Sequence, residues 1–248
     1  VVQDFNHESD ALDLVVIGRW TVGDPPESVP FFQPFTGQGD GTFKMDTFHE
    51  PVNPEKNPSA MAAAKLTGKS NYDIVMANAG TNDVTLFFAK GLGLFSAKDN
   101  EAPNFAVGAA PQKVAAAVIE DPDDTRPDIV TLLKTGVAIM YSENTIDVTF
   151  KTVDYLGLSE PPANDMALAD MNGDGYTDII TISKSASRVT VYLNLAFRKY
   201  SDPFVFGTGK GPASLVVADL NHDSCMDVAT ADESGETVTI LKNLLCSK

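Results

Sequence analysis

The feature that most restricts the fold of this chain is an internal repeat. The segment at 166–194, MALADMNGDGYTDIITISKSASRVTVYLN, has a second copy at 215–243, and weaker copies lie at 1–17, 61–77 and 114–132. The five copies align on aspartates that are 60, 55, 50 and 49 residues apart, namely Asp13, Asp73, Asp128, Asp178 and Asp227. A period of about 50 residues is typical of propeller blades and solenoid coils.

Each copy contains short β-rich runs separated by turn residues. A run of small residues such as VAAAVI comes first, a polar loop follows, and an Asp then opens a β-branched run such as DIITIS. A third, alternating run such as VTVYLN comes next, and a Phe closes four of the units, at Phe43, Phe95, Phe150 and Phe204. Such runs predict strands, and no window of a dozen residues sustains a helical period.

Four antiparallel strands in each unit are the arrangement of a propeller blade. The sequence therefore predicts an all-β chain: a single β-propeller domain of about five four-stranded antiparallel blades, at 1–57, 58–110, 111–162, 163–210 and 211–248. The last copy ends after its third strand, so the last blade is predicted to be incomplete. This leaves open whether five blades close a ring or belong to a larger propeller. An open sandwich is the alternative fold.

The charge balance excludes some partners. The chain has 18 Lys and Arg against 34 Asp and Glu, a net charge of −16. Nucleic acids and anionic membranes require clusters of basic residues, so neither is expected as a partner. No run approaches 18 apolar residues, so no transmembrane helix is expected. The first ten residues, VVQDFNHESD, lack the pattern of a signal peptide, and we expect a mature or trimmed chain.

The motifs of the last two copies resemble a known family. The sequence ADMNGDGYTDIITI at 169–182, followed by VTVYLN at 189–194, is similar to the FG-GAP/VCBS repeat of integrin-type β-propellers, and GQGDGTF at 37–43 and FGTGKGPAS at 206–214 resemble its glycine-rich stretches. The resemblance extends over all five copies. It implies a propeller that is usually extracellular, that holds calcium in some blade loops, and that more often binds proteins or glycans than catalyses.

The loop of the fourth copy is a candidate calcium site. Oxygen side chains stand at loop positions 1, 3, 5 and 9, and a backbone carbonyl is available at position 7; the ligand set is Asp170, Asn172, Asp174, Tyr176 (carbonyl) and Asp178. Ca²⁺ takes six to eight oxygen ligands, and a loop with acids at alternate positions can surround it. A polar hairpin loop with Asx-turns and no ion is the alternative.

Other copies repeat this spacing to different degrees. The fifth copy gives a second calcium site, with the ligand set Asp219, Asn221, Asp223, Cys225 (carbonyl) and Asp227. The first copy carries an extra residue and gives a weaker third candidate, with Asp4, Asn6, Glu8 and Asp13. The loops at 65–73 and 120–128 contain Lys, Arg or Pro at ligand positions, and we expect no ion there.

Two cysteines and one tryptophan complete the candidates. Cys225 lies in the loop before the second strand of the last blade and Cys246 follows its third strand, so both are expected on the same face and a disulfide is predicted. Two unrelated thiols are the alternative. Trp20 lies in a predicted insertion at 19–30 between two strands. It is a candidate ligand contact, with packing over its own hairpin as the alternative.

The function predicted from these features is recognition. We expect an extracellular or cell-surface, calcium-binding, non-catalytic module for adhesion or assembly, with a protein or glycan ligand and with a partner or neighbouring domain at the edge formed by 237–243. An enzyme domain of the lyase or dehydratase kind is the first alternative, since related propellers carry such activities. A structural fragment of a larger propeller is the second. Only three His are present and no Gly-x-Ser-x-Gly occurs, which disfavours hydrolase chemistry.

Overall fold

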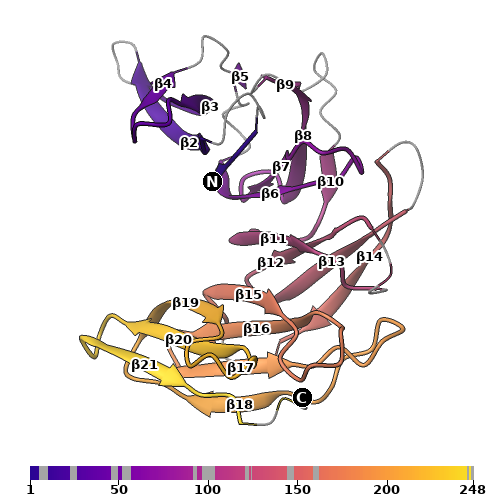
Figure 1. Cartoon of the computed structure of the whole chain (residues 1–248), viewed down its shortest axis with the longest axis vertical. Coiled ribbons are helices and arrows are strands. Elements are labelled where there is room, and N and C mark those ends of the chain that lie inside the picture. The colour runs from indigo at the N-terminus through magenta and orange to yellow at the C-terminus, as the bar shows by residue number, and fades with distance from the viewer. Residues whose placement is uncertain are drawn as a thin grey trace. The chain divides into compact units, whose positions relative to one another are not determined.

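Every regular element in the described part of the chain is a β-strand (Figure 1). The computed structural model describes residues 1–5, 11–22, 27–45, 50–51, 57–91, 94–96, 104–120, 123, 125–143, 148–158, 162–244 and 246. The described strands form five antiparallel sheets, the blades of a β-propeller. The chain divides near residue 116 into two compact units. No helix among the described residues is long and apolar enough to cross a membrane.

The first two sheets have five strands each. The first has the order β1-β2-β3-β4, with β5 also paired to β3; its strands are β1 (Val2–Gln3), β2 (Asp13–Val22), β3 (Glu27–Gly37), β4 (Phe43–Met45) and β5 (Glu50–Pro51). The second has the order β10-β8-β7-β6, with β9 also paired to β8; its strands are β6 (Pro58–Ala64), β7 (Asp73–Asn78), β8 (Asp83–Gly91), β9 (Leu94–Ser96) and β10 (Asn104–Ala106).

The remaining sheets follow the chain in simple order. The third is β11 (Lys113–Ala117), β12 (Asp128–Leu132), β13 (Gly136–Ser142) and β14 (Phe150–Gly157). The fourth is β15 (Asp165–Ala169), β16 (Asp178–Ser183), β17 (Arg188–Tyr192) and β18 (Phe204–Gly207). The fifth has only three strands among the described residues, β19 (Pro212–Ala218), β20 (Asp227–Asp232) and β21 (Thr237–Leu241).

The predicted fold class is confirmed. Each sheet lies within one of the five predicted ranges, and the anchoring aspartate of each copy is the first residue of the second strand of its blade. The incomplete last blade is seen as the three-stranded fifth sheet. One prediction is wrong: 19–30 is not an insertion between strands, because β2 and β3 extend into it and pair as far as Val22 with Glu27.

The second strands of three blades and the third strand of one blade are buried along their whole length. Every residue of β7, β12, β13 and β16 is buried. In the first unit, aromatic side chains fill the space between the first two blades, and the Phe32 and Phe87 rings stack at 4.5 Å between centroids. In the second unit, Ile180, Val189 and Val191 of the fourth blade belong to a buried cluster, and Leu215 and Val217 of the fifth blade pack against it.

Candidate functional site

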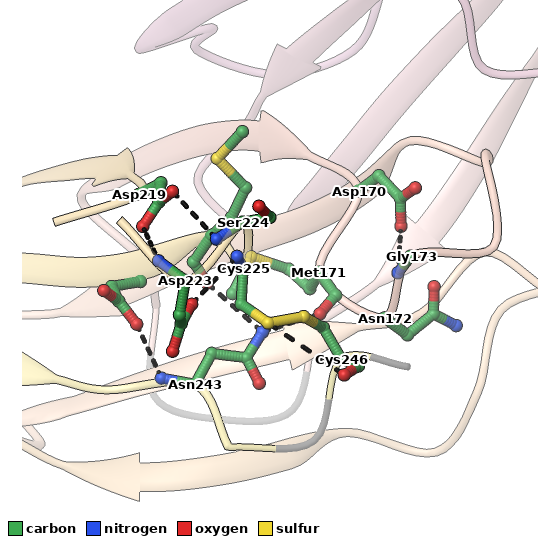
Figure 2. The surroundings of a disulfide bond; sticks show 12 residues. Asp170, Met171, Asn172, Gly173, Asp219, Asp223, Ser224, Cys225, Asn243 and Cys246 are labelled. Carbon is green, nitrogen blue, oxygen red and sulfur yellow. Dashed lines mark hydrogen bonds between the residues drawn. A yellow bond between two sulfur atoms is a disulfide. The ribbon is translucent and has the colours of Figure 1, made fainter. Parts of the chain in front are cut away.

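The two loops predicted to bind calcium lie in the second unit, at equivalent places in adjacent blades. The first joins β15 to β16, and the second joins β19 to β20. Figure 2 shows parts of both, with Asp170 to Gly173 of the first and Asp219, Asp223, Ser224 and Cys225 of the second around the Cys225–Cys246 bond. A hollow of about 590 Å³ is lined by residues of both loops and by that bond.

The two loops share four internal hydrogen bonds. In the first, Asp170 accepts from the backbone amides of loop positions 5 and 6 at 3.3 and 2.8 Å, Asn172 from position 5 at 3.1 Å, and Asp174 from position 7 at 2.9 Å; Asp170 also accepts from position 4 at 2.7 Å. In the second, position 1 accepts from positions 5 and 6, position 3 from position 5, and position 5 from position 7, at 2.9–3.1 Å. The oxygen side chains at positions 1, 3 and 5 therefore turn inward over their own loop.

The backbone bends in the same way in both loops, although the residues differ. Gly173 and Gly175 have φ of 77° and 89°, and His222 and Ser224 at the matching positions have φ of 61° and 73°. Glycine adopts this left-handed conformation without strain, whereas a residue with a Cβ does not. The second loop thus keeps the conformation of the first in spite of its sequence.

Position 9 of each loop has a structural role that the sequence did not reveal. In all five blades the carboxylate of the anchoring aspartate accepts one backbone N–H from the preceding loop, at 2.8–3.2 Å. Its other oxygen accepts a backbone N–H at or near the end of the third strand, at 2.7–3.0 Å. The five aspartate clamps are Asp13, Asp73, Asp128, Asp178 and Asp227.

The clamp aspartates are costly to bury as anions. Burial raises the pKa of both Asp73 and Asp128, against the backbone hydrogen bonds that lower it. For Asp178, burial raises the pKa to about 6, and the negative charges of Asp174 and Asp170 add to the effect. The fourth-blade loop therefore gathers negative charge that a cation would relieve.

The donor set of these loops fits a hard cation in chemistry, but its atoms do not converge on one point. All side-chain donors in the first loop are carboxylate or amide oxygens, the ligands that Ca²⁺ prefers. Each carboxylate oxygen can accept more than one bond, so lone pairs remain beside the N–H contacts. No group of three or more His, Cys, Asp or Glu in the described part of the chain is arranged to hold a metal. Calcium binding therefore stays a prediction.

The weaker candidate in the first blade is only partly described. Asn6 and Glu8 lie outside the described residues. Asp13 is the clamp of its blade and accepts from Phe5 and Gly37. Asp4 takes part in other interactions, so the described residues do not form a set of calcium ligands around it.

The predicted disulfide is confirmed. Cys225 and Cys246 are bonded, with their Cα atoms 5.8 Å apart and a sequence separation of 21 (Figure 2). The bond joins position 7 of the second loop to the segment after β21. It ties the only three-stranded sheet of the described residues to the chain that follows it.

Two asparagines that sequence reasoning missed connect neighbouring blades. The side-chain amide of Asn243 donates to the carbonyl of Met171, in the loop of the preceding blade, at 2.7 Å. Asn194, at the matching place one blade earlier, donates to the carbonyl of Ile119 at 2.8 Å. The signal was present in the sequence, since both close the runs VTVYLN and VTILKN.

Trp20 is placed only by its backbone. It lies in β2 opposite Val29 of β3. Its side chain is outside the described part of the structure, so its role as a ligand contact stays a prediction.

The comparisons with known proteins agree with the fold. Residues 170–230, which include both loops, match the family described as FG-GAP-like repeat. No curated protein matches the chain in sequence.

Solved structures of similar fold are distant in sequence. One is a lectin of Agrocybe aegerita described as specifically recognising non-reducing terminal N-acetylglucosamine, at 15% identity and a TM-score of 0.50 over 99% of this chain and 80% of the lectin. Another is BBS1N, solved in complex with ARL6DN, at 13% identity and a TM-score of 0.53 over 80% of this chain and 61% of that one. A third is the V. cholerae biofilm matrix protein Bap1, at 15% identity and a TM-score of 0.54 over 99% of this chain and 37% of Bap1. At these identities the likeness shows the fold alone.

Proposed function

We propose, from the match of residues 170–230 to the FG-GAP-like repeat family and from the propeller fold, that this chain is an extracellular, calcium-binding recognition module without catalytic activity. The observation that carries the proposal is the pair of matched oxygen-rich loops in adjacent blades. A disulfide joins the second loop to the segment after β21. Disulfides persist in oxidising compartments, which supports an extracellular location.

Calcium would have a structural part in this function. Asp170, Asn172, Asp174 and Asp178, with the Tyr176 carbonyl, would hold one ion, and Asp219, Asn221, Asp223 and Asp227, with the Cys225 carbonyl, would hold a second. The ion would neutralise the clustered carboxylates and fix the loops that line the hollow between the two blades. The ligand would be a protein or a glycan, in keeping with the lectin and the biofilm matrix protein among the similar folds.

The test separates binding from catalysis. The chain is incubated with a panel of polysaccharides and with immobilised glycans and secreted proteins, in millimolar Ca²⁺ and in excess chelator. We expect saturable retention of at least one ligand, weaker in chelator, without release of reducing ends or unsaturated products. Product release at a rate above that of heat-denatured protein would instead establish the lyase-like alternative. Retention of no ligand in either buffer would refute recognition.

A further inference from the structure

A second pocket lies in the same unit, away from the two loops. It has a volume of about 280 Å³ and is lined by one face of the β13–β14 hairpin and by residues of the turn that follows β17. On the hairpin side, Ile139 and Asp154 are cross-strand partners. On the turn side, the pocket is lined by Arg198 and Tyr200.

Arg198 is held firmly on one side and is open on the other. Its Nε and Nη2 atoms lie 3.0 and 2.9 Å from the same carboxylate oxygen of Glu120. Its guanidinium carbon lies 4.2 Å from the centre of the Tyr141 ring. Its third nitrogen, Nη1, lies 3.9 Å from a carboxylate oxygen of Asp154, which is beyond hydrogen-bond distance. The pocket therefore holds an N–H donor and a carboxylate acceptor side by side, not bonded to each other.

The turn that carries Arg198 is strained. Ala196, Phe197 and Arg198 have φ of 63°, 50° and 60°, three consecutive left-handed residues with side chains. Each such residue is disfavoured relative to the right-handed conformation, because its Cβ lies too close to the following carbonyl oxygen. The turn is closed by the amide of Leu195, which donates to the carbonyl of Lys199 at 2.8 Å. Strain of this kind persists where the surroundings fix it, and it occurs often at binding sites.

Two buried hydroxyl groups belong to side chains that line the pocket. The hydroxyl groups of Tyr141 and Tyr200 are buried and interact with each other, although the pair does not have normal hydrogen-bond geometry. Burial, and then the negative charge of Asp154, raises the pKa of Tyr141 to about 12, and burial raises that of Tyr200 further. Both groups therefore stay protonated near neutral pH.

The chemistry of the pocket selects a neutral ligand rich in hydroxyl groups. The pocket has one cation, Arg198, which is already paired with Glu120, and one carboxylate, Asp154. An anionic ligand would therefore meet more negative than positive charge. A hydroxyl group, which both donates and accepts, fits between Nη1 of Arg198 and Asp154. Leu156 offers apolar surface to C–H groups. The volume is slightly below the range of about 300–1,000 Å³ for drug-sized ligands, which suits one small ring.

We infer that the pocket between the β13–β14 hairpin and the turn at 195–199 binds a single neutral sugar ring, such as the end of a glycan chain. One hydroxyl of the ring bridges Arg198 and Asp154, and the C–H face of the ring lies on Leu156. The inference rests on the proposed recognition function and narrows it from a protein or glycan ligand to an uncharged sugar terminus at a defined site.

The probe is an array of immobilised glycans with neutral, sialylated and sulfated ends, followed by titration calorimetry with the methyl glycosides of the neutral sugars that bind. We expect the full chain to bind neutral ends. Asp154→Ala and Arg198→Lys should each weaken binding at least tenfold, because each leaves a ligand hydroxyl without its partner. Asp202→Ala is the matched control; it removes an exposed carboxylate two residues from Tyr200 that does not line the pocket, and affinity should stay within twofold.

The outcomes separate this inference from the function on which it rests. Neutral-sugar binding that both pocket variants retain, with unchanged melting temperatures, refutes the pocket but leaves recognition standing. Binding only to charged glycans, or only to a protein in the panel described above, also refutes the sugar pocket and leaves recognition standing. If no glycan and no protein is retained, both fail. Arg198→Lys keeps the charge beside Glu120, and Asp154 is a partly exposed side chain, so a melting curve for each variant verifies that the fold is intact.

Discussion

At the scale of single residues, the aspartate clamp explains why one position is acidic in all five blades. Its two oxygens take backbone N–H donors from the loop before β16 and from the chain after β17, and likewise in the other blades. A carboxylate accepts at both oxygens, whereas an amide can accept at only one. The clamp therefore requires Asp even in the second blade, where the loop before Asp73 has no other acid.

Replacing a clamp should cost stability in a blade without a candidate ion site. Asp128→Asn places an amide N–H against the amide of either Ile119 or Ser142, and leaves that buried donor without a partner. We expect a loss of about 1–3 kcal/mol in the free energy of unfolding. Urea denaturation measures it, with the exposed Asp202→Asn as a control that should change by less than about 0.5 kcal/mol. An equal loss in both variants would contradict the clamp.

At the left-handed position 6 of the two loops, replacing Ser by Gly and replacing Gly by Ser should have opposite effects on stability. Ser224→Gly removes strain at φ 73°, whereas Gly175→Ser introduces it at φ 89°, where no atom lies near enough for a side chain to clash. We expect a gain of about 1 kcal/mol in the first variant and a loss of about 1 kcal/mol in the second. Thermal unfolding in calcium-free buffer measures both. Changes of the same sign would show that the two loops do not share a backbone conformation.

The Asp178 carboxyl predicts a pH dependence with a definite sign. Its pKa is raised from 3.8 to about 6 in the folded chain. The folded state therefore binds its proton more tightly, so this group favours folding below pH 3.8, and that contribution is lost as the pH rises through about 6. Carboxyl NMR should show this titration in chelator and a lower pKa in millimolar Ca²⁺. An unchanged pKa on adding Ca²⁺ would argue against a site at this loop.

At the scale of elements, the disulfide and the third strand of the last blade act together. Cys225 and Cys246 enclose β20 and β21, with a sequence separation of 21. Closing a loop of this length contributes about 3 kcal/mol in the chain-entropy model. Because β21 has no described fourth strand outside it, the bond restrains an element that is packed less completely than its counterparts.

Removal of the disulfide should lower stability by about 3 kcal/mol. Cys246→Ser and chemical reduction of the wild type should give the same shift in denaturant midpoint, because both open the same loop. Thiol labelling of the unreduced, denatured chain should find no reactive thiol. Two reactive thiols per chain would refute the bond.

Most of the element order could be predicted, because the repeat period and the anchoring Asp mark where each second strand begins. The extent of β2 and β3 could not, because Pro and Gly at 23–30 are typical of a loop, yet the strands pair as far as Val22 and Glu27. Local propensity was overridden there by continued pairing. The clamp was missed for a different reason: a metal ligand and a backbone acceptor require the same residue, and only geometry distinguishes them.

At the scale of the whole molecule, one face of the fifth blade is exposed, whereas the matching face of the fourth blade is buried. The fourth blade buries Ile180, Val189 and Val191 against the fifth. The residues at matching positions on the fifth blade include Val238 and Ile240, which are 69% and 63% exposed. An apolar sheet face next to an unpaired edge strand is a surface that other chains can join. The partner expected from the sequence at 237–243 stays a prediction.

Calcium should act on the stability of the chain by mass action, because an ion bound only by the folded loops favours the folded state. At a Ca²⁺ concentration about 100 times the dissociation constant, one site adds about 2.7 kcal/mol. We expect a higher melting temperature in millimolar Ca²⁺ than in excess chelator. Asp174→Asn should reduce the difference, whereas Asp202→Asn should not. Identical melting curves in the two buffers would refute calcium binding.

The Cys225–Cys246 bond also decides how the last blade responds to a mechanical load. A pull on the chain after Cys246 would otherwise open the β20–β21 hydrogen bonds one at a time, from the end of β21. The bond diverts the load to Cys225, in the loop before β20, so the hairpin between the two cysteines carries no tension. The blade must then yield elsewhere, at contacts that break together rather than in sequence.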